Sequence, residues 1–129
     1  MQHRSAEGVE WGPAGEEHFT GSAEFGPLHP PADDADLNVL GVVFQAGART
    51  DWHSHPAGQV LFIVEGTALV GTEDQTVVAG PGAAVHAPAG QVHWHGATAG
   101  GPMRHLSITH GGPTEWLPRK VTDEEYGRR

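Results

Sequence analysis

The chain has 129 residues, which is enough for one domain with a modest core and too few for two. Its formal net charge of -9, with only 7 lysines and arginines, argues against nucleic acids and anionic membranes as partners. Cysteine is absent, which excludes disulfides and thiolate chemistry.

No apolar run is long enough for a membrane span, and none follows the N-terminus, so we expect a soluble, cytoplasmic protein. The 19 glycines, 10 prolines and charged fraction of 18% indicate many tight turns and favour an all-β chain. We expect a polar N-terminal arm at residues 1–17, a single β domain at 18–121, and a short C-terminal helix or tail at 122–129.

The first elements of the domain differ in how clearly they can be assigned. Residues 18–25 alternate weakly and predict an edge strand, and the prolines and aspartates of residues 26–36 predict a loop. Residues 37–45 predict a strand that is apolar on both faces. Such a strand needs cover on both sides, so we expect a second copy of the chain over one face.

Residues 47–66, GARTDWHSHPAGQVLFIVEG, carry the most informative pattern of the chain. His53 and His55 are two residues apart on an extended segment, so their side chains point to the same face, as in a chelating pair. The strand at residues 59–65 follows, with Gln59, Leu61 and Ile63 sharing one face.

The remaining elements are short strands and turns. Residues 67–71 and 75–79 predict a hairpin, and a strand at 83–87 leads through the turn at 88–90 to His93, a third candidate ligand. A strand at residues 103–110 carries His105 on a polar face, which is typical of a strand that lines a hydrated pocket. Thr122 and Glu125 have the spacing of a capping box at the start of a helix.

Together, residues 47–66 and the stretch GAAVHAPAGQVHWHGA at 82–97 resemble the paired motifs of the cupin superfamily. The resemblance covers residues 38–110 and implies an antiparallel β-barrel of cupin or jelly-roll type. It implies that His53, His55, Gln59 and His93 bind one divalent metal. Cupins usually have glutamate where this chain has Gln59, and asparagine in place of Ala97. An amide adds no negative charge, so the cation would be a stronger Lewis acid.

The succession GARTDWHSHPAGQ, PAGQVHWHG, RHLSI and EWLPRKVTDEEY is similar to that of small bacterial manganese-dependent hydroxynitrile lyases. That similarity implies reversible cleavage of a cyanohydrin, a small-molecule substrate, to an aldehyde and cyanide. It implies manganese as the metal, His105 as a catalytic base in the pocket and Thr50 beside it. His95 shares the face of His93 and is an alternative ligand or supporting group.

Two other functions stay open. Imidazole and amide ligands suit manganese, iron, nickel and zinc alike, so an iron-dependent dioxygenase is one alternative. A non-catalytic barrel that binds a small ligand is the other. We further expect a homodimer or homotetramer that covers the strand at 37–44 and the terminal segments around Trp11 and Trp116. The other histidines are expected at the surface, namely His3, His18, His29, His86 and His110.

Overall fold

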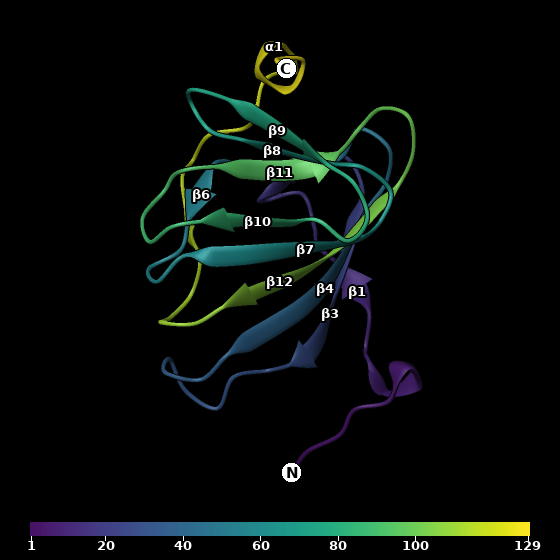
Figure 1. The fold of residues 1–129 in the computed structure, drawn as a ribbon, viewed down its shortest axis with the longest axis vertical. Coiled ribbons are helices and arrows are strands. Elements are labelled where there is room, and N and C mark those ends of the chain that lie inside the picture. Colours follow the sequence, from purple (N-terminus) through teal and green to yellow (C-terminus); the bar gives the residue numbers. More distant parts are fainter.

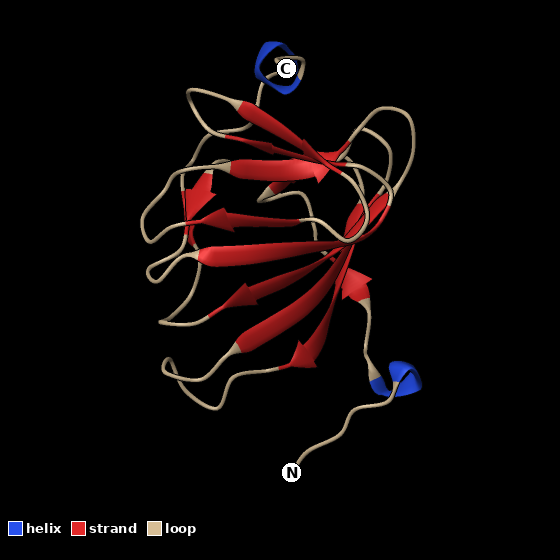
Figure 2. Cartoon of the chain, in the orientation of Figure 1, coloured by secondary structure: helices blue, strands red, loops and turns tan.

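Antiparallel sheets make up most of the structure, a computed structural model that describes residues 1–129 (Figure 1). The strands are β1 (Gly12–Pro13), β2 (Phe19–Thr20), β3 (Ala23–His29), β4 (Asn38–Phe44), β5 (Arg49–Thr50), β6 (His53–Ser54), β7 (Gln59–Glu65), β8 (Ala68–Gly71), β9 (Thr76–Ala79), β10 (Ala84–Ala87), β11 (Trp94–Ala97), β12 (Met103–Thr109) and β13 (Glu115–Trp116). The helices are the short 3-10 turn η1 (Ala6–Gly8) and the single α-helix α1 (Asp123–Tyr126) (Figure 2). The expected all-β antiparallel barrel with a short C-terminal helix is confirmed.

The strands form one six-stranded sheet in the order β1-β3-β4-β12-β7-β10 and one five-stranded sheet in the order β2-β5-β11-β8-β9. β6 and β13 form a separate pair. In Figure 1, β8, β9 and β11 lie above β7, β12, β4 and β3, with α1 at the top of the molecule and the N-terminal arm at the bottom. None of the helices has the length and apolar character that a membrane crossing requires.

Period-two alternation in the central strands separates the inside of the barrel from the outside. In β7, Gln59, Leu61 and Ile63 are buried, whereas Phe62 and Val64 are more than a third exposed. β12 alternates in the same way, so its buried His105 and Ser107 lie opposite Ile63 and Leu61. The interior is therefore lined by apolar and polar groups from the same strands, as the sequence pattern predicts.

The edge near the N-terminus differs from the prediction in two places. Residues 18–25 are not one strand, because Gly21 adopts a positive φ of 79° and divides them into β2 and β3, which belong to different sheets. Residues 26–36 are not all loop, since β3 continues through Pro27 to His29. β1 pairs with β3 only at Glu24 and Phe25, so Pro27 faces an open edge where its missing N–H disrupts no ladder.

The N-terminal arm lies on the outside of the six-stranded sheet. A Cβ added to Gly26 or Gly41 would lie within 3 Å of the Trp11 indole, so the ring packs directly on the backbone of these two glycines. Arg104 lies over the same ring, with its guanidinium carbon 5.4 Å from the centroid. The arm thus covers one part of a sheet face that otherwise carries apolar side chains.

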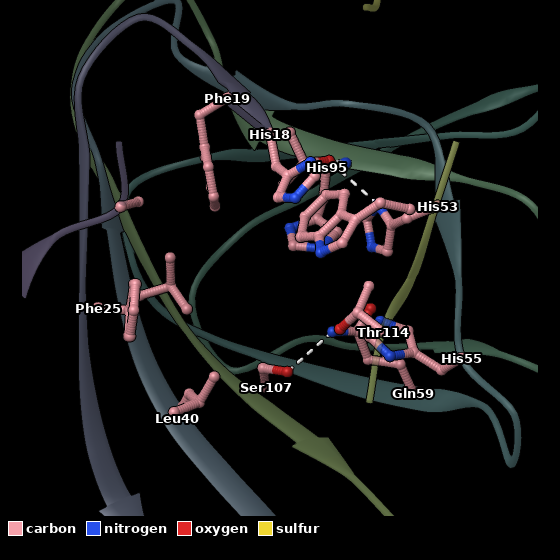
Figure 3. A pocket seen from close by; sticks show the side chains of 14 residues that line it. His18, Phe19, Phe25, Leu40, His53, His55, Gln59, His95, Ser107 and Thr114 are labelled. Carbon is pink, nitrogen blue, oxygen red and sulfur yellow. Dashed lines mark hydrogen bonds between the residues drawn. The ribbon is translucent and has the colours of Figure 1, made fainter. Parts of the chain in front are cut away.

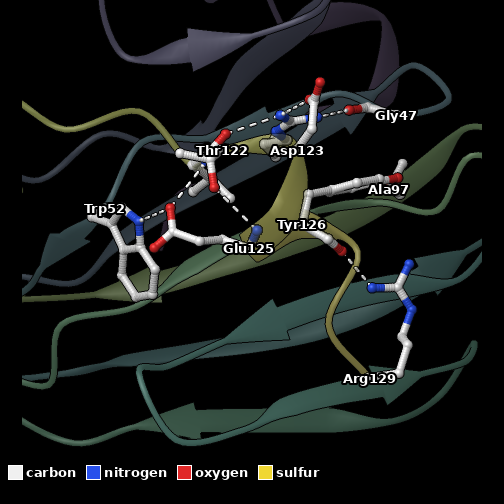
Figure 4. Close-up of polar contacts among 10 residues, drawn as sticks. Gly47, Trp52, Ala97, Thr122, Asp123, Glu125, Tyr126 and Arg129 are labelled. Atoms are coloured by element: carbon white, nitrogen blue, oxygen red, sulfur yellow. Dashed lines mark hydrogen bonds and ion pairs between the residues drawn. The ribbon is translucent and has the colours of Figure 1, made fainter.

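The C-terminal segment crosses the barrel beside the histidine-rich motif. β13 pairs with β6, which sets Trp116 opposite His53. The capping box predicted at Thr122 and Glu125 is present, and α1 is anchored by an ion pair of 2.9 Å between Arg49 and Asp123 (Figure 4). The last residues of the chain therefore support the strand that carries a candidate metal ligand.

Candidate metal centre

Three histidines meet inside the barrel, as expected from their spacing. His53 lies in β6, His55 follows it, and His93 immediately precedes β11. The backbones of His53 and His93 exchange two hydrogen bonds of 2.9 Å, which bring the two sequence motifs together. One ring nitrogen from each of the three residues lies within 4.8 Å of the others, and all three side chains are buried. This cluster could hold a metal ion.

The ring orientations of two of these histidines are set by backbone carbonyl groups. The Nδ1 of His53 lies 2.9 Å from the Asp51 oxygen, and the Nδ1 of His93 lies 2.8 Å from the Gln91 oxygen. Each Nδ1–H donates to its carbonyl, which leaves the Nε2 lone pair available for a metal. The backbone thus selects the tautomer that a metal ligand requires.

Burial keeps the three imidazoles neutral. It is the main cause that lowers the pKa of His53 well below its ordinary range, and the neighbouring His93 adds to the effect. Burial also lowers the pKa of His93, and it lowers that of His55 to about 4. At neutral pH the three rings are therefore unprotonated at their ligand nitrogens and need not lose a proton to bind a cation.

Gln59 points to the same cluster. Its amide nitrogen donates to Ser107 Oγ at 2.8 Å, and its Oε1 lies 2.9 Å from His93 Nε2. Because His93 Nδ1 already donates to a carbonyl, two acceptor atoms face each other here, an arrangement that a shared cation stabilises. The Nε2 of His55 is also buried without a hydrogen-bond partner. These residues fit a divalent cation held by imidazole nitrogens and one amide oxygen.

A cavity of about 330 Å³ opens next to this cluster (Figure 3). One end is polar and includes His53, His55 and Gln59, with Thr50 and Ser107 beside them. Figure 3 shows Phe19, Phe25 and Leu40 on the side of the cavity away from His55 and Gln59, so that side is apolar. The cavity can therefore bind a small molecule that has an apolar group at one end and an oxygen at the other.

His105 lies on the inward face of β12 but does not line the cavity. It is fully buried, and its Nε2 lies 3.0 Å from the Nδ1 of His95, which does line the cavity. The Nε2 of His95 is buried without a partner, and the His95 backbone N–H donates to Thr50 Oγ1 at 3.2 Å. His105 is thus placed behind His95, so the group that faces the cavity is His95.

Burial also keeps this second histidine pair neutral. It is the main cause that lowers the pKa of His95 well below its ordinary range, and the neighbouring His105 lowers it further. The pKa of His105 falls to about 4, again mainly through burial. Both rings are therefore neutral at neutral pH, and each has one ring nitrogen without a proton.

Two further residues of the cavity wall were not predicted. His18, which was expected at the surface, lines the cavity together with Trp116. Their rings stack with centroids 4.3 Å apart and an interplanar angle of 1°. The Trp116 ring is also 4.8 Å from that of His53. Residues 18–25 alternate only weakly and the segment around Trp116 does not alternate, so the sequence pattern does not place either ring at the cavity.

Comparisons with known proteins agree with this geometry. The cupin domain family matches residues 41–109. The (R)-mandelonitrile lyase of Granulicella tundricola is 39% identical over 121 residues, which cover 91% of this chain and 90% of that enzyme. A cupin-like protein from Thermotoga maritima has a TM-score of 0.83 at 33% identity, covering 98% of this chain and 92% of that one. The polyketide cyclase RemF from Streptomyces resistomycificus, at 18% identity and a TM-score of 0.76 over 98% of this chain and 90% of its own, shares the fold.

Proposed function

The chain belongs to the cupin domain family, and within that family we propose that it is a metal-dependent lyase that cleaves cyanohydrins to an aldehyde and cyanide. The observation that carries this proposal is the 39% identity to an (R)-mandelonitrile lyase across 91% of the chain. The cavity supports it, because an apolar end suits the side chain of a cyanohydrin and a polar end suits its hydroxyl group.

We propose that His53, His55, His93 and Gln59 hold one divalent ion, and that this ion is manganese. When bound, the cation supplies a Lewis acid that holds the substrate oxygen and stabilises the negative charge that develops on it. The protein needs no other cofactor for this chemistry. The neutral donor set supports the proposal, since it leaves the charge of the cation undiminished.

In this proposal, His95 is the base that contacts the substrate. If its Nδ1–H donates to His105 Nε2 across their 3.0 Å contact, its own Nε2 carries a lone pair that faces the cavity. His95 then removes the hydroxyl proton, the O–H electron pair forms the carbonyl, and the carbon–carbon bond breaks with its electrons leaving on cyanide. The proton on His95 is returned to cyanide, so that hydrogen cyanide is released.

His105 and Thr50 have positioning roles in the same scheme. His105 accepts the Nδ1–H of His95 and stabilises the imidazolium that forms when His95 takes up a proton. Thr50 accepts the backbone N–H of His95 and fixes the start of β11. This arrangement retains the histidine base expected from the sequence and moves the contact with substrate to His95.

The test is a direct assay of protein purified without a histidine tag. Manganese-loaded protein should release cyanide from mandelonitrile, and its metal content should fall to background in the His53→Ala, His55→Ala double variant. Equal metal content in the two proteins would refute the metal site. Loaded protein that releases no cyanide would refute the lyase, and oxygen uptake by the iron-loaded form would favour the dioxygenase alternative.

A further inference from the structure

Lys120 is the only lysine of the chain, and its ammonium group is surrounded by oxygen atoms. Nζ lies 2.8 Å from the Glu16 carbonyl oxygen, 3.2 Å from that of Glu17 and 3.3 Å from that of Phe19. The fourth oxygen is Asp51 Oδ1 at 3.1 Å, on a side chain that is only 4% exposed. An ammonium group has three donors, which the three carbonyl oxygens use, and Asp51 Oδ1 is in ion-pair contact with it without a hydrogen bond.

The three carbonyl groups belong to the segment that forms one wall of the cavity. His18 and Phe19 of this segment line the cavity, and His18 stacks on Trp116 (Figure 3). β2 is only two residues long, so few ladder hydrogen bonds hold the segment. The backbone N–H of Asp51 donates to the His18 carbonyl at 2.8 Å, which is a further tether. Lys120 adds side-chain hydrogen bonds to the carbonyl groups of this segment.

Lys120 also joins this wall to the C-terminal segment. It follows Trp116 by four residues, and Trp116 forms the neighbouring part of the cavity wall. Contacts between an ammonium group and a buried carboxylate or carbonyl oxygens are charge-assisted and stronger than neutral hydrogen bonds. One side chain therefore fixes the distance between two parts of the wall that are about a hundred residues apart in sequence.

We propose that Lys120 is a positioning residue that holds residues 16–20 against the cavity and so determines how tightly the aromatic ring of a substrate is bound. This inference rests on the proposed function for the nature of the substrate, but it concerns the wall and not the metal site. Without Lys120, the wall that carries His18 and Phe19 moves outward, and contacts with a planar ring are lost before contacts with the hydroxyl group.

The test compares Lys120→Met with Arg128→Met as a matched control. Arg128 has a side chain that is 52% exposed against 50% for Lys120, and its only ion pair is a 3.8 Å contact with Glu124 at the surface. Binding of benzyl alcohol to the manganese-loaded proteins is measured by calorimetry, together with kcat and KM for mandelonitrile and for acetone cyanohydrin, which has no ring. Metal content is measured in every sample.

In Lys120→Met we expect the Kd for benzyl alcohol and the KM for mandelonitrile to rise by roughly tenfold, because a misplaced wall loses well-packed contacts. The KM for acetone cyanohydrin and the metal content should change little, and Arg128→Met should resemble the native protein. Unchanged Kd and KM in Lys120→Met would overturn the inference. A loss of metal with unchanged Kd would also overturn it, since Lys120 would then act through Asp51 on His53.

If Lys120→Met fails to fold, a second variant keeps the proposal testable. Lys120→Met leaves the buried Asp51 carboxylate without its cation, and the Lys120→Met, Asp51→Asn double variant removes that unpaired charge. We expect the double variant to fold and to show the same rise in Kd for benzyl alcohol; native-like binding in it would overturn the inference. Benzyl alcohol binding does not require turnover, so a native protein that binds it without cleaving mandelonitrile would refute the lyase and leave the role of Lys120 testable.

Discussion

His95 and His105 are the residues whose roles the structure most clearly separates. Both are buried, but only His95 reaches the cavity. A general base has to come within hydrogen-bonding distance of the proton that it removes, and a group behind it can act only by stabilising it. The two side chains should therefore contribute differently to turnover.

We predict that His95→Ala lowers kcat for mandelonitrile by roughly a hundredfold or more, the usual scale for a general base, with metal content unchanged. His105→Ala should lower kcat less, because His95 still faces the cavity. Steady-state kinetics and elemental analysis of both variants test this order, with substitution of the exposed residue directly after β12, His110→Ala, as the control. A larger loss in His105→Ala would assign the base to His105, and loss of metal in either variant would make that residue part of the metal site.

At the scale of the element, α1 and the segment before it pack against Trp52, the residue next to His53. Thr122 caps the helix reciprocally with Glu125, and Glu125 also contacts the Trp52 indole nitrogen at 3.4 Å (Figure 4). Trp52 directly precedes His53, and the Arg119 guanidinium lies over its ring at 4.5 Å. A four-residue helix is too short to be stable alone, so its cap and these contacts maintain it.

We predict that Thr122→Ala lowers the free energy of unfolding by about 1 kcal/mol, the typical cost of a lost N-cap side chain. Thr122→Ser retains the hydroxyl group and should be close to the native protein. Urea unfolding followed by tryptophan fluorescence measures both. If the alanine and serine variants are equally stable, the capping box contributes nothing to stability.

A strand could be predicted from the sequence where apolar and polar residues alternate along it. β7 and β12 are buried on one face, so their period-two pattern predicts both the strands and their inward side chains. β2 and β13 are two-residue strands in segments that alternate weakly or not at all, and their place is determined by pairing with β5 and β6. Alternation also predicts on which face of the sheet a side chain lies, but not whether that side chain reaches the cavity. His105 could therefore be assigned to the interior of the barrel, but its position behind His95 could not be predicted.

At the scale of the whole molecule, the outer face of the six-stranded sheet is apolar beyond the area that Trp11 covers. Val60 pairs with Ile108 and Phe62 with Leu106, and Ile108 also pairs with Val39, so these side chains form a continuous patch. Phe62, at the centre of this patch, is 39% exposed. We propose that a second copy of the chain covers this patch in a homodimer or homotetramer.

The prediction is that light scattering at micromolar concentration gives at least twice the 13.6 kDa mass of the chain, and that Phe62→Glu shifts the protein to 13.6 kDa. Val78→Glu is the matched control, because Val78 is 56% exposed but belongs to the five-stranded sheet. A native protein that behaves as a single 13.6 kDa particle would refute the assembly, and an equal effect of both variants would refute the interface.

Five buried neutral histidines also make the fold sensitive to acid, namely His53, His55, His93, His95 and His105. Folding lowers the pKa of each from about 6.5, so between pH 6.5 and about 4 the unfolded chain binds more protons than the folded one. The stability that these groups contribute is thus fully present above pH 6.5 and is lost as the pH falls toward 4.

We predict that the metal-free protein has a lower free energy of unfolding at pH 5 than at pH 7.5, by on the order of 2 kcal/mol from His105 alone. Urea titrations in the presence of a chelator at the two pH values measure the difference. A free energy of unfolding that is equal at both pH values, or higher at pH 5, would show that folding does not lower the pKa of these histidines.

The pairing of β6 with β13 can form only late in the synthesis of the chain. Trp116, which pairs with His53, follows it by 63 positions. At the usual pace of translation, about 5–20 residues per second, the strand with His53 waits some 3–12 s for its partner strand. During that interval the growing chain already contains all four proposed ligands for part of the time, but β6 lacks its only strand partner. Until residue 116 has been made, the His53 backbone is therefore without its β13 partner, although its two hydrogen bonds to His93 involve only residues made earlier.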